Sequence, residues 1–244
     1  MDDNFQRLHT SEDEVRRTLK QVNPNNASGP DNIALGVLKT SAAQLAHIFC
    51  IIFNVCFSTN TVPAAWKTIC IVPVPKRPVI LSLDDLCHVA LTAAVMKVCV
   101  RVVLCKLDSL VKNYSDPLQF ANRRNRSTVD AVLYVLENIN LHLEKNREFC
   151  MTDVLPVPVP LIQSHSHVQK LSDMKLPSSV ISWIFDYPTK RLQYVWLSGA
   201  LSSVICTNTG APQGTVLAPF LFSLYTADCN HCVCVSGFCP DDIS

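Results

Sequence analysis

The sequence predicts an α+β fold, in which helices pack on a small antiparallel sheet. Apolar residues make up 48% of the 244 residues, which is enough to bury a sizeable core. Apolar stretches with helical spacing alternate irregularly with short β-branched runs, and no segment repeats. This mixed order of elements is typical of the α+β class.

The N-terminal part is predicted to be mainly helical. Ser11 and Glu14 have the spacing of a capping box, and an apolar run with helical spacing follows them. The Asn-, Gly- and Pro-rich stretch at residues 23–33 predicts tight turns. A long apolar helix is expected over residues 35–57. Its run "IFCIIFNVCF" is too short to span a membrane, so we interpret it as a buried helix.

The middle of the chain predicts a strand followed by a second apolar helix. A β-branched run at residues 68–74 indicates the strand, and its two prolines confine its end to a sheet edge because proline lacks an N–H. The helix is expected over residues 84–111, and two adjacent aspartates at its start are explained by N-cap chemistry. Lys97, Arg101 and Lys106 lie on this helix among core positions.

The remaining elements follow from caps, prolines and alternation. They are predicted in this order: a helix capped by Ser127 and Asp130 at about residues 129–145, a strand ending near Asp153, a helix ending near Asp186, a hairpin around Gly199 and a helix over residues 214–227.

Composition limits the classes of function. Charged residues are 17% of the chain and the net charge is +1, so any binding of phosphates depends on local basic clusters. Two groups of basic residues are candidates, although a solvated surface explains them equally well: Arg123, Arg124 and Arg126 in one loop, and Lys67, Lys76 and Arg77 around the strand at residues 68–74.

The cysteines and the N-terminus indicate an intracellular protein, nuclear or cytoplasmic, that is not secreted. The polar and acidic start differs from a secretory signal, and most of the 12 cysteines lie in apolar runs, so we expect reduced thiols. Cys229, His231 and Cys232 are close together near the end. Because no second pair has zinc-finger spacing, we do not expect a zinc site.

Two segments have the chemistry of a site. In "GAPQG" two glycines bracket Pro212 and Gln213, which gives a bare backbone and one projecting amide before a helix; an ordinary turn is the alternative. Asp241 and Asp242 are adjacent carboxylates that could hold Mg²⁺ together with Asp153, and a solvated end is the alternative.

The order of these motifs resembles the reverse transcriptase domain of non-LTR, Jockey-like (LINE-type) retrotransposons over nearly the whole chain. The segments that carry the resemblance are "ASGPDNI", "VPAAWKTICIVPVPK", "LTAAVMKVCVRVVLCKL", "DPLQFANRRNRSTVDAV" and "GAPQGTVLAPFLFSLY". The last of these is similar to the Pro-Gln-Gly motif of the family almost residue for residue.

The resemblance implies a right-hand polymerase, with fingers-like helices at residues 1–145 and a partial palm at residues 146–244. The palm would be incomplete and the thumb absent, because the chain ends after the aspartate pair. RNA template, DNA primer and dNTPs are the implied partners, and Mg²⁺ the implied cofactor. The implied site residues are Asp153, Asp241 and Asp242 as catalytic metal ligands, Gln213 and Gly214 against the template–nucleotide pair, and Lys76, Arg123 and Arg126 as contacts to phosphates.

Three departures from the family pattern leave the function open between two hypotheses. Val157 and Pro158 stand where the family has a small residue and an aromatic, Cys87 and His88 replace an Arg-Pro, and Pro240 precedes the aspartate pair. The chain is expected to be either a reverse transcriptase fragment or a non-catalytic remnant. The remnant would be inert or would bind nucleic acid.

Overall fold

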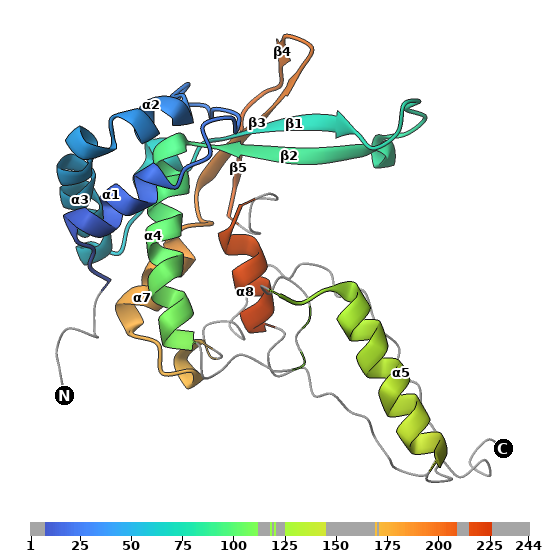
Figure 1. Ribbon diagram of the computed structural model, residues 1–244. Coiled ribbons are helices and arrows are strands. Elements are labelled where there is room, and N and C mark those ends of the chain that lie inside the picture. Colours follow the sequence, from blue (N-terminus) through green and yellow to red (C-terminus); the bar gives the residue numbers. More distant parts are fainter. Residues whose placement is uncertain are drawn as a thin grey trace.

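The computed structural model describes residues 8–111, 118, 120, 125–144, 169, 171–208 and 215–225. Helices and strands are mixed along these residues, as the α+β prediction requires. The elements are α1 (Glu12–Lys20), α2 (Leu35–Thr40), α3 (Ala42–Ser58), η2 (Ala64–Trp66), β1 (Ile69–Pro75), η3 (Leu83–Asp85), β2 (Leu86–Thr92), α4 (Ala94–Val111), α5 (Thr128–Glu144), α7 (Ser178–Asp186), β3 (Arg191–Leu197), β4 (Ala200–Leu201), β5 (Ile205–Thr207) and α8 (Leu217–Tyr225). Figure 1 shows α1 to α4 gathered on one side, the β1–β2 hairpin projecting from them, and α5 standing apart.

One hydrophobic core joins α1, α3, α4, α7 and α8. Its largest fully buried side chains include Trp183, Phe53 and Phe57. The rings of Phe57 and Trp183 meet edge to face with centroids 6.0 Å apart, an arrangement that aromatic pairs favour. Helix α4 runs through the centre of this core, and ten of its 18 residues are buried.

The predicted capping box at the start of α1 is confirmed. The Ser11 hydroxyl accepts a hydrogen bond from the Glu14 N–H, and the Glu14 carboxylate accepts one from the Ser11 N–H. The same carboxylate lies 3.0 Å from Lys106 Nζ on α4, and Asn54 of α3 accepts a hydrogen bond from the Thr10 N–H. Polar contacts therefore tie the start of α1 to both neighbouring helices.

Helix α3 is only partly buried, contrary to the prediction for its apolar run. Ile48, Ile51 and Val55 are each more than half exposed. Their spacing places them on one stripe of the helix, opposite the core residues Phe53 and Phe57. High apolar content therefore predicts the helix but does not show which of its faces is covered.

The sheet is mixed, which corrects the prediction of an antiparallel sheet. The strand order is β2-β1-β3-β4, and β5 also pairs with β3. Strands β1 and β2 are antiparallel along their whole length, whereas β1 and β3 are parallel from Ile69–Gln193 to Ile71–Val195. The long connection between β1 and β3, which contains α4, α5 and α7, allows the chain to return in the same direction.

The end of β1 that contains the two prolines lies at a sheet edge, as the sequence predicts. The Lys76 N–H donates to the carbonyl of Asp85 on the β2 side. Because successive residues of a strand alternate their hydrogen bonds between its two sides, Pro73 and Pro75 lack N–H groups on the side of β3. Pairing with β3 stops at Ile71, and pairing with β2 continues to Pro75.

The helix predicted over residues 84–111 is wrong in its first part. Residues 86–92 form strand β2, and the helix begins only at Ala94. Asp85 folds back in the turn η3, where its carboxylate accepts hydrogen bonds from the N–H groups of Leu81 and Ser82. This turn reverses the chain and sets β2 beside β1, so strand pairing overrides the apolar pattern.

The single helix predicted over residues 35–57 is wrong in its first part, because the chain forms two helices, α2 and α3, that are separated at Ser41. The predicted hairpin and the predicted limits of α5 and α7 agree with the structure. The hairpin turns at Ser198 and Gly199, which both have positive φ (49° and 87°), the geometry that matches the twist of paired strands. Helix α7 ends at Asp186. Helix α5 begins after Ser127, whose hydroxyl lies 2.7 Å from the Asp130 carboxylate.

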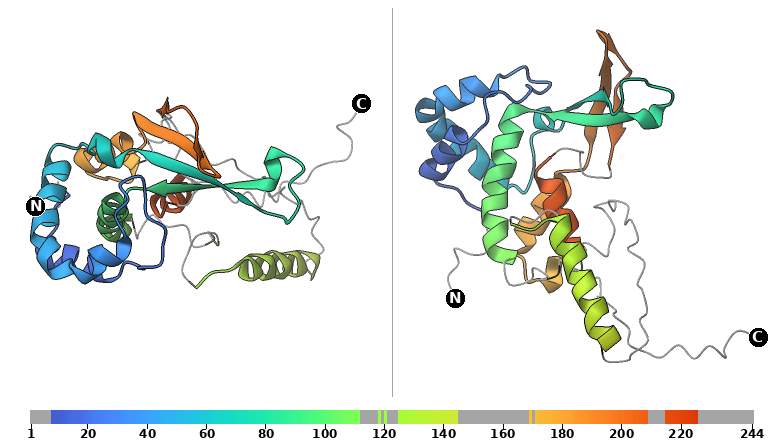
Figure 2. Two further views of the ribbon diagram at one scale, coloured as in Figure 1. Left: turned by 90° about the horizontal axis from the view of Figure 1, so that it is seen from above. Right: turned by 45° about the vertical axis from the view of Figure 1, so that its right-hand side comes forward.

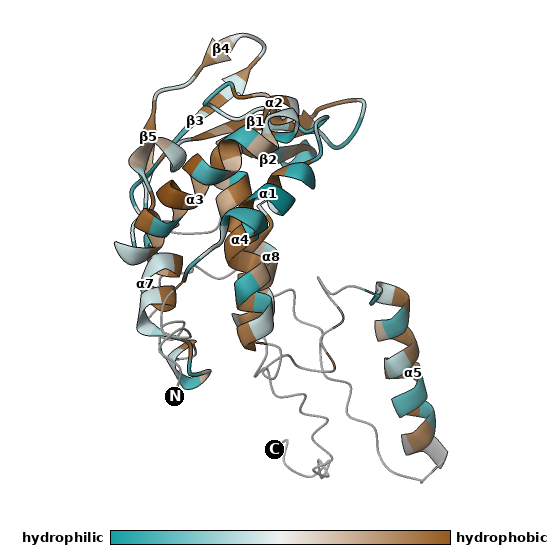
Figure 3. Ribbon diagram, turned by 60° about the vertical axis from the view of Figure 1, so that its left-hand side comes forward, coloured by the Kyte–Doolittle hydropathy of each residue, from teal (hydrophilic) through white to brown (hydrophobic). Residues whose placement is uncertain are grey.

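Helix α5 lies away from the other described elements in two views (Figures 1 and 3). Figure 2 shows the β1–β2 hairpin also projecting beyond the helices. Within the described residues, no helix combines the length and apolar character needed to cross a membrane. The seven cysteines in this part of the chain are free thiols, and Cys105 and Cys206 are exposed.

Candidate nucleic-acid interface

A cavity of about 270 Å³ lies beside the N-terminal half of α4. Four segments far apart in the sequence form its wall: residues 26–27, the end of β2 at residues 89–92, α4, and residues 215–216 just before α8. Tyr187 also lines the cavity. The cavity is therefore the place where the described parts of several sequence motifs meet.

Two cations line this cavity, Lys97 and Arg101. They are four residues apart on α4 and lie on one face of the helix. Lys97 Nζ donates to the carbonyl of Ala27, 2.8 Å away. Burial lowers the pKa of Lys97; the charge of Asp31 opposes this shift and that of Arg101 adds to it. The cavity wall is thus positively charged and partly desolvated.

The loop with "SGPD" packs against the start of α4. A Cβ added to Gly29 would lie 2.1 Å from the carbonyl oxygen of Thr92, so only glycine fits there. Asp31 caps the helix, since its carboxylate accepts a hydrogen bond of 2.7 Å from the Ala94 N–H. These two contacts give the loop a structural role and fix residues 26–27 at the cavity.

Tyr187 supports the opposite wall. It is 3% exposed, and its side chain hydrogen-bonds to Thr215, the residue after Gly214. Burial raises the pKa of Tyr187, which keeps the phenol neutral. The guanidinium of Arg191 lies over its ring, 5.8 Å from the centroid. Tyr187 thus anchors the segment that follows the Pro-Gln-Gly motif.

Lys67, one of the predicted basic candidates, has a structural role. It is 7% exposed, and its Nζ lies 2.9 Å from the Asp186 carboxylate at the end of α7. The same oxygen accepts a hydrogen bond of 2.6 Å from the Val62 N–H. Lys67 therefore joins the start of the sheet to α7 and is not available to an external phosphate.

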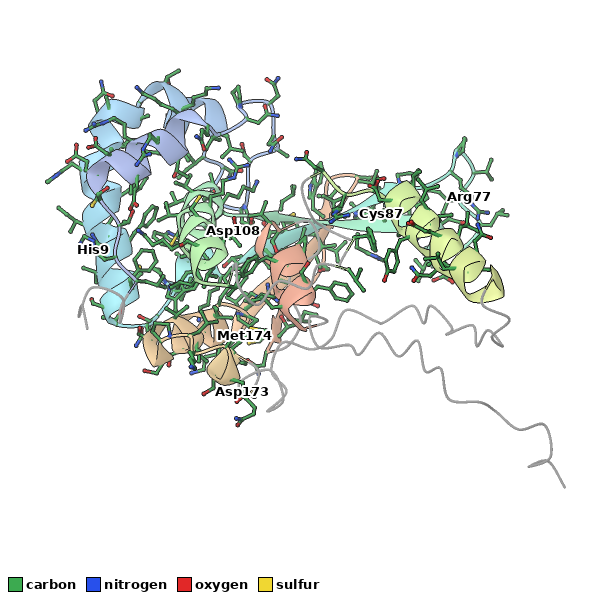
Figure 4. All side chains as sticks on the ribbon, turned by 60° about the horizontal axis from the view of Figure 1, so that its bottom comes forward. His9, Arg77, Cys87, Asp108, Asp173 and Met174 are labelled. Carbon is green, nitrogen blue, oxygen red and sulfur yellow. The ribbon has the colours of Figure 1, made fainter. Side chains whose placement is uncertain are left out.

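Lys76 and Arg77 lie at the far end of the β1–β2 hairpin. Lys76 Nζ donates to the carbonyl of Asp84, 2.9 Å away, and Arg77 Nε lies 3.6 Å from the Asp85 carboxylate. Figure 4 shows Arg77 and Cys87 on this hairpin. About four residues of strand, roughly 13 Å, separate Lys76 from the part of the hairpin that lines the cavity.

Arg126 lies at the start of α5 and stacks on an aromatic side chain. Its guanidinium carbon is 5.4 Å from the centroid of Phe120, and that ring packs on Tyr134 at 5.8 Å. Arg126 is exposed. A guanidinium that lies over an aromatic ring can still donate hydrogen bonds from its edge to a phosphate.

The other predicted site residues lie outside the described residues: Asp153, Asp241, Asp242, Gln213, Gly214 and Arg123. Within the described residues, no group of three His, Cys, Asp or Glu side chains could hold a metal ion. The proposed ligand set therefore stays a prediction. Thr215 and Val216, which directly follow Gly214, do line the cavity.

Four curated proteins match most of the chain at low identity, and no protein-family model matches it. The chain is 25% identical over 222 residues to the probable RNA-directed DNA polymerase from transposon X-element of Drosophila melanogaster, and 24% identical over 225 residues to that from transposon BS. It is 22% identical over 220 residues to the RNA-directed DNA polymerase from mobile element jockey. Each match covers 88% of this chain and 24% of the relative.

The resemblance to Jockey-like, non-LTR reverse transcriptases is confirmed. The chain spans about a quarter of the length of the curated relatives it matches.

Sequence reasoning placed Lys97 and Arg101 on a helix but missed their common cavity. Their spacing of four residues within an apolar helix was the available signal.

Proposed function

We propose that this chain is part of an RNA-directed DNA polymerase of a retrotransposon. The observation that carries the proposal is the convergence of three motif segments on one cavity: the "ASGPDNI" loop, the end of β2 with α4, and the residues after Pro-Gln-Gly. A polymerase must hold template, nucleotide and metal ions at one place, so distant motifs that share one cavity support this activity.

The predicted division into fingers at residues 1–145 and palm at residues 146–244 remains part of the proposal. Under it, α1 to α5 and the β1–β2 hairpin belong to the fingers. The sheet extends across the predicted boundary, since β1 pairs with β3. The RNA template, the DNA primer and the incoming dNTP would meet on the side of the cavity, inside the cell in the nucleus or cytoplasm.

In the proposed reaction, the primer 3′-hydroxyl attacks the α-phosphate of a dNTP, and pyrophosphate leaves. Asp153, Asp241 and Asp242 form a set of carboxylates of the kind that Mg²⁺ prefers, and bound ions would stabilise the charge on the attacking and leaving oxygens. Gln213 and Gly214 would orient the template–nucleotide pair. Lys76, Arg123 and Arg126 would contact phosphates, and the exposed position of Lys76 and Arg126 is compatible with this role.

A non-catalytic remnant that binds nucleic acid is the second candidate. Pro240, directly before the aspartate pair, favours it, because proline cannot donate to a sheet ladder at that position. The basic loop with Arg123, Arg124 and Arg126 would then carry the binding. This candidate shares its ligand with the polymerase and lacks only the chemistry.

Primer extension separates the two candidates. The full chain is incubated with a primed RNA template, dNTPs and Mg²⁺, in parallel with Asp241→Ala and with Asp108→Ala, which removes an exposed carboxylate of α4 (Figure 4). Extension by the parent and by Asp108→Ala, lost in Asp241→Ala, supports the polymerase. Binding of the primed template without extension by any of the three supports the remnant.

A further inference from the structure

Strand β2 forms one edge of the sheet. It comes first in the strand order and pairs only with β1 among the described strands. The Lys76 N–H donates to the carbonyl of Asp85, and the backbone hydrogen bonds of a strand alternate between its two sides. Leu86, His88 and Ala90 therefore direct their N–H and C=O groups away from β1. Among the described residues, no hydrogen bond reaches these groups.

The side chains along this edge do not prevent the addition of another strand. Exposed edge strands commonly carry charged side chains or prolines that block pairing with a second chain. Strand β2 has neither, since both prolines of the hairpin lie on β1. The hairpin tip beside it is apolar and projects past the helices (Figure 2): Val79, Leu81 and Leu83 are 65%, 87% and 79% exposed. An uncharged edge next to an exposed apolar tip is the kind of surface that binds another strand.

One end of the β2 edge is closed, which fixes the length that a partner can use. The carbonyl of Thr92 also points away from β1, and it lies so close to Gly29 that an added Cβ would be 2.1 Å from its oxygen. The open part of the edge is therefore residues 86–90, and its centre is His88. A segment with this centre can pair with an identical antiparallel segment, so that every outward N–H faces a carbonyl.

We propose that the open edge at residues 86–90 binds the same edge of a second copy of this chain. The two strands run antiparallel about a two-fold axis at His88, and Leu86 of each copy pairs with Ala90 of the other. Charge favours this partner, because the exposed Asp84 at each hairpin tip comes to the base of the other hairpin, where Lys97 lies. No salt bridge among the described residues includes Lys97.

A charge at the two-fold axis tests this arrangement, because it meets its own copy. Sedimentation velocity of the full chain in reducing buffer gives the mass over a dilution series, and the parent should pass from two copies to one. His88→Glu and His88→Lys should each raise the dissociation constant of the dimer by about tenfold or more, since like charges across an interface repel. An equimolar mixture of the two variants should restore a dimer with one copy of each.

Two further variants separate strand pairing from general effects of substitution. His88→Pro removes an N–H that points away from β1, so it should weaken the dimer and leave the hairpin paired. Leu201→Glu is the matched control, because it places the same charge on β4 at the opposite edge of the sheet, where Leu201 is 66% exposed. This control should keep the parental dissociation constant. Thermal unfolding of each variant controls for folding, and His88 is exposed, so the fold should be retained.

Four results would overturn the proposal. They are a parent that is monomeric at every concentration, a dimer that the charged variants at His88 leave unchanged, an equal loss in Leu201→Glu, and a mixture of the two charged variants that stays monomeric. Hydrogen exchange identifies the occupant in the first case, because slow exchange at residues 86–90 of a monomer would assign the edge to another segment of the same chain. The outcome does not depend on polymerase activity, which is measured separately by primer extension.

Discussion

Helices α4 and α5 are almost equal in length, 18 and 17 residues, and both are rich in Val and Leu, yet their surroundings differ completely. Ten residues of α4 are buried, whereas none of the α5 side chains that the structure describes is buried. Figure 3 shows brown segments on both helices, but only those of α4 lie among other helices.

The difference in burial shows which interactions support each helix. A helix of this length is marginal in water by itself, so α4 depends on the core that surrounds it. Helix α5 has local support, since Ser127 and Asp130 satisfy each other's hydrogen bonds at its start. Changes in α4 should therefore alter the stability of the whole fold, and changes in α5 should act locally.

Truncation of one leucine in each helix gives the largest contrast. Leu107 on α4 is fully buried, and Leu133 on α5 is 59% exposed. Leu107→Ala should lower the free energy of unfolding by about 2–5 kcal/mol, because it removes apolar burial and leaves a cavity. Leu133→Ala should change it by less than about 0.5 kcal/mol. Urea unfolding followed by circular dichroism measures both, and similar losses in the two variants would show that α5 also belongs to the core.

A pair of glycines tests the contact that positions α4. Gly29→Ala would place a Cβ against the backbone of Thr92 and Ala93, and neither can move without shifting β2 or α4. The expected loss is about 1–3 kcal/mol. Gly36→Ala is the control, since its Cβ would meet only Pro24 at 3.7 Å and alanine favours the helix by roughly 0.5–1 kcal/mol. A Gly29→Ala variant as stable as the parent would contradict the close packing.

The two helices also show how far sequence reasoning reaches. Local signals predicted the helix starts at Ser11 and Ser127 and the turn at Gly199, because caps and turns depend on neighbouring residues. The burial of α4 and the exposure of the Ile48 stripe on α3 depend on distant elements, and the apolar pattern of each helix gives no sign of them. Strand β2 was mistaken for helix for the same reason, since its pairing with β1 decides its structure.

The candidate site also has parts that could be predicted from local sequence and parts that could not. The Pro-Gln-Gly and "ASGPDNI" segments were recognised from sequence because each is a compact motif. The cavity was not, because it needs Ala27, Lys97 and Thr215 from three segments to be brought together. The role of Lys67 was equally hidden, since its partner Asp186 is more than a hundred residues away.

The caps of the two helices provide a smaller and more specific contrast. The Asp31 carboxylate caps α4 from a distant loop, and the Asp130 carboxylate accepts a hydrogen bond from the Ser127 N–H at the start of α5. Asp31→Ala should lower the free energy of unfolding by about 0.5–2 kcal/mol, because the Ala94 N–H loses its acceptor in a partly buried site. Asp130→Ala should leave the global transition unchanged and speed amide exchange only in residues 128–144. Hydrogen exchange with mass spectrometry detects both, and global loss in Asp130→Ala would contradict the local role of the α5 cap.

Lowering the pH should produce the smallest change in stability, and it should affect α4 and α5 in different ways. Burial raises the pKa of Glu14, but hydrogen bonds from Ser11, Lys106 and Thr10 outweigh this effect and leave the pKa below its ordinary value. A carboxyl group with a lowered pKa in the folded state stabilises the fold above its unfolded pKa of about 4.3, and this contribution is lost as the pH falls through the folded pKa. Stability of the α1–α4 contact should therefore decrease below about pH 4.3.

Glu14→Gln removes that contribution at every pH, so the free energy of unfolding of this variant should depend less on pH below about 4.3 than that of the parent. Because the Glu14 side chain is 37% exposed, salt should weaken the effect. Hydrogen bonds from Ser127 lower the pKa of Asp130 as well, but there protonation should only loosen the start of α5. An equal pH slope in Glu14→Gln and the parent would show that the Glu14–Lys106 pair does not link α1 to α4 in solution. If Asp130→Ala also changed the pH dependence of the free energy of unfolding, this would show that α5 is coupled to the core.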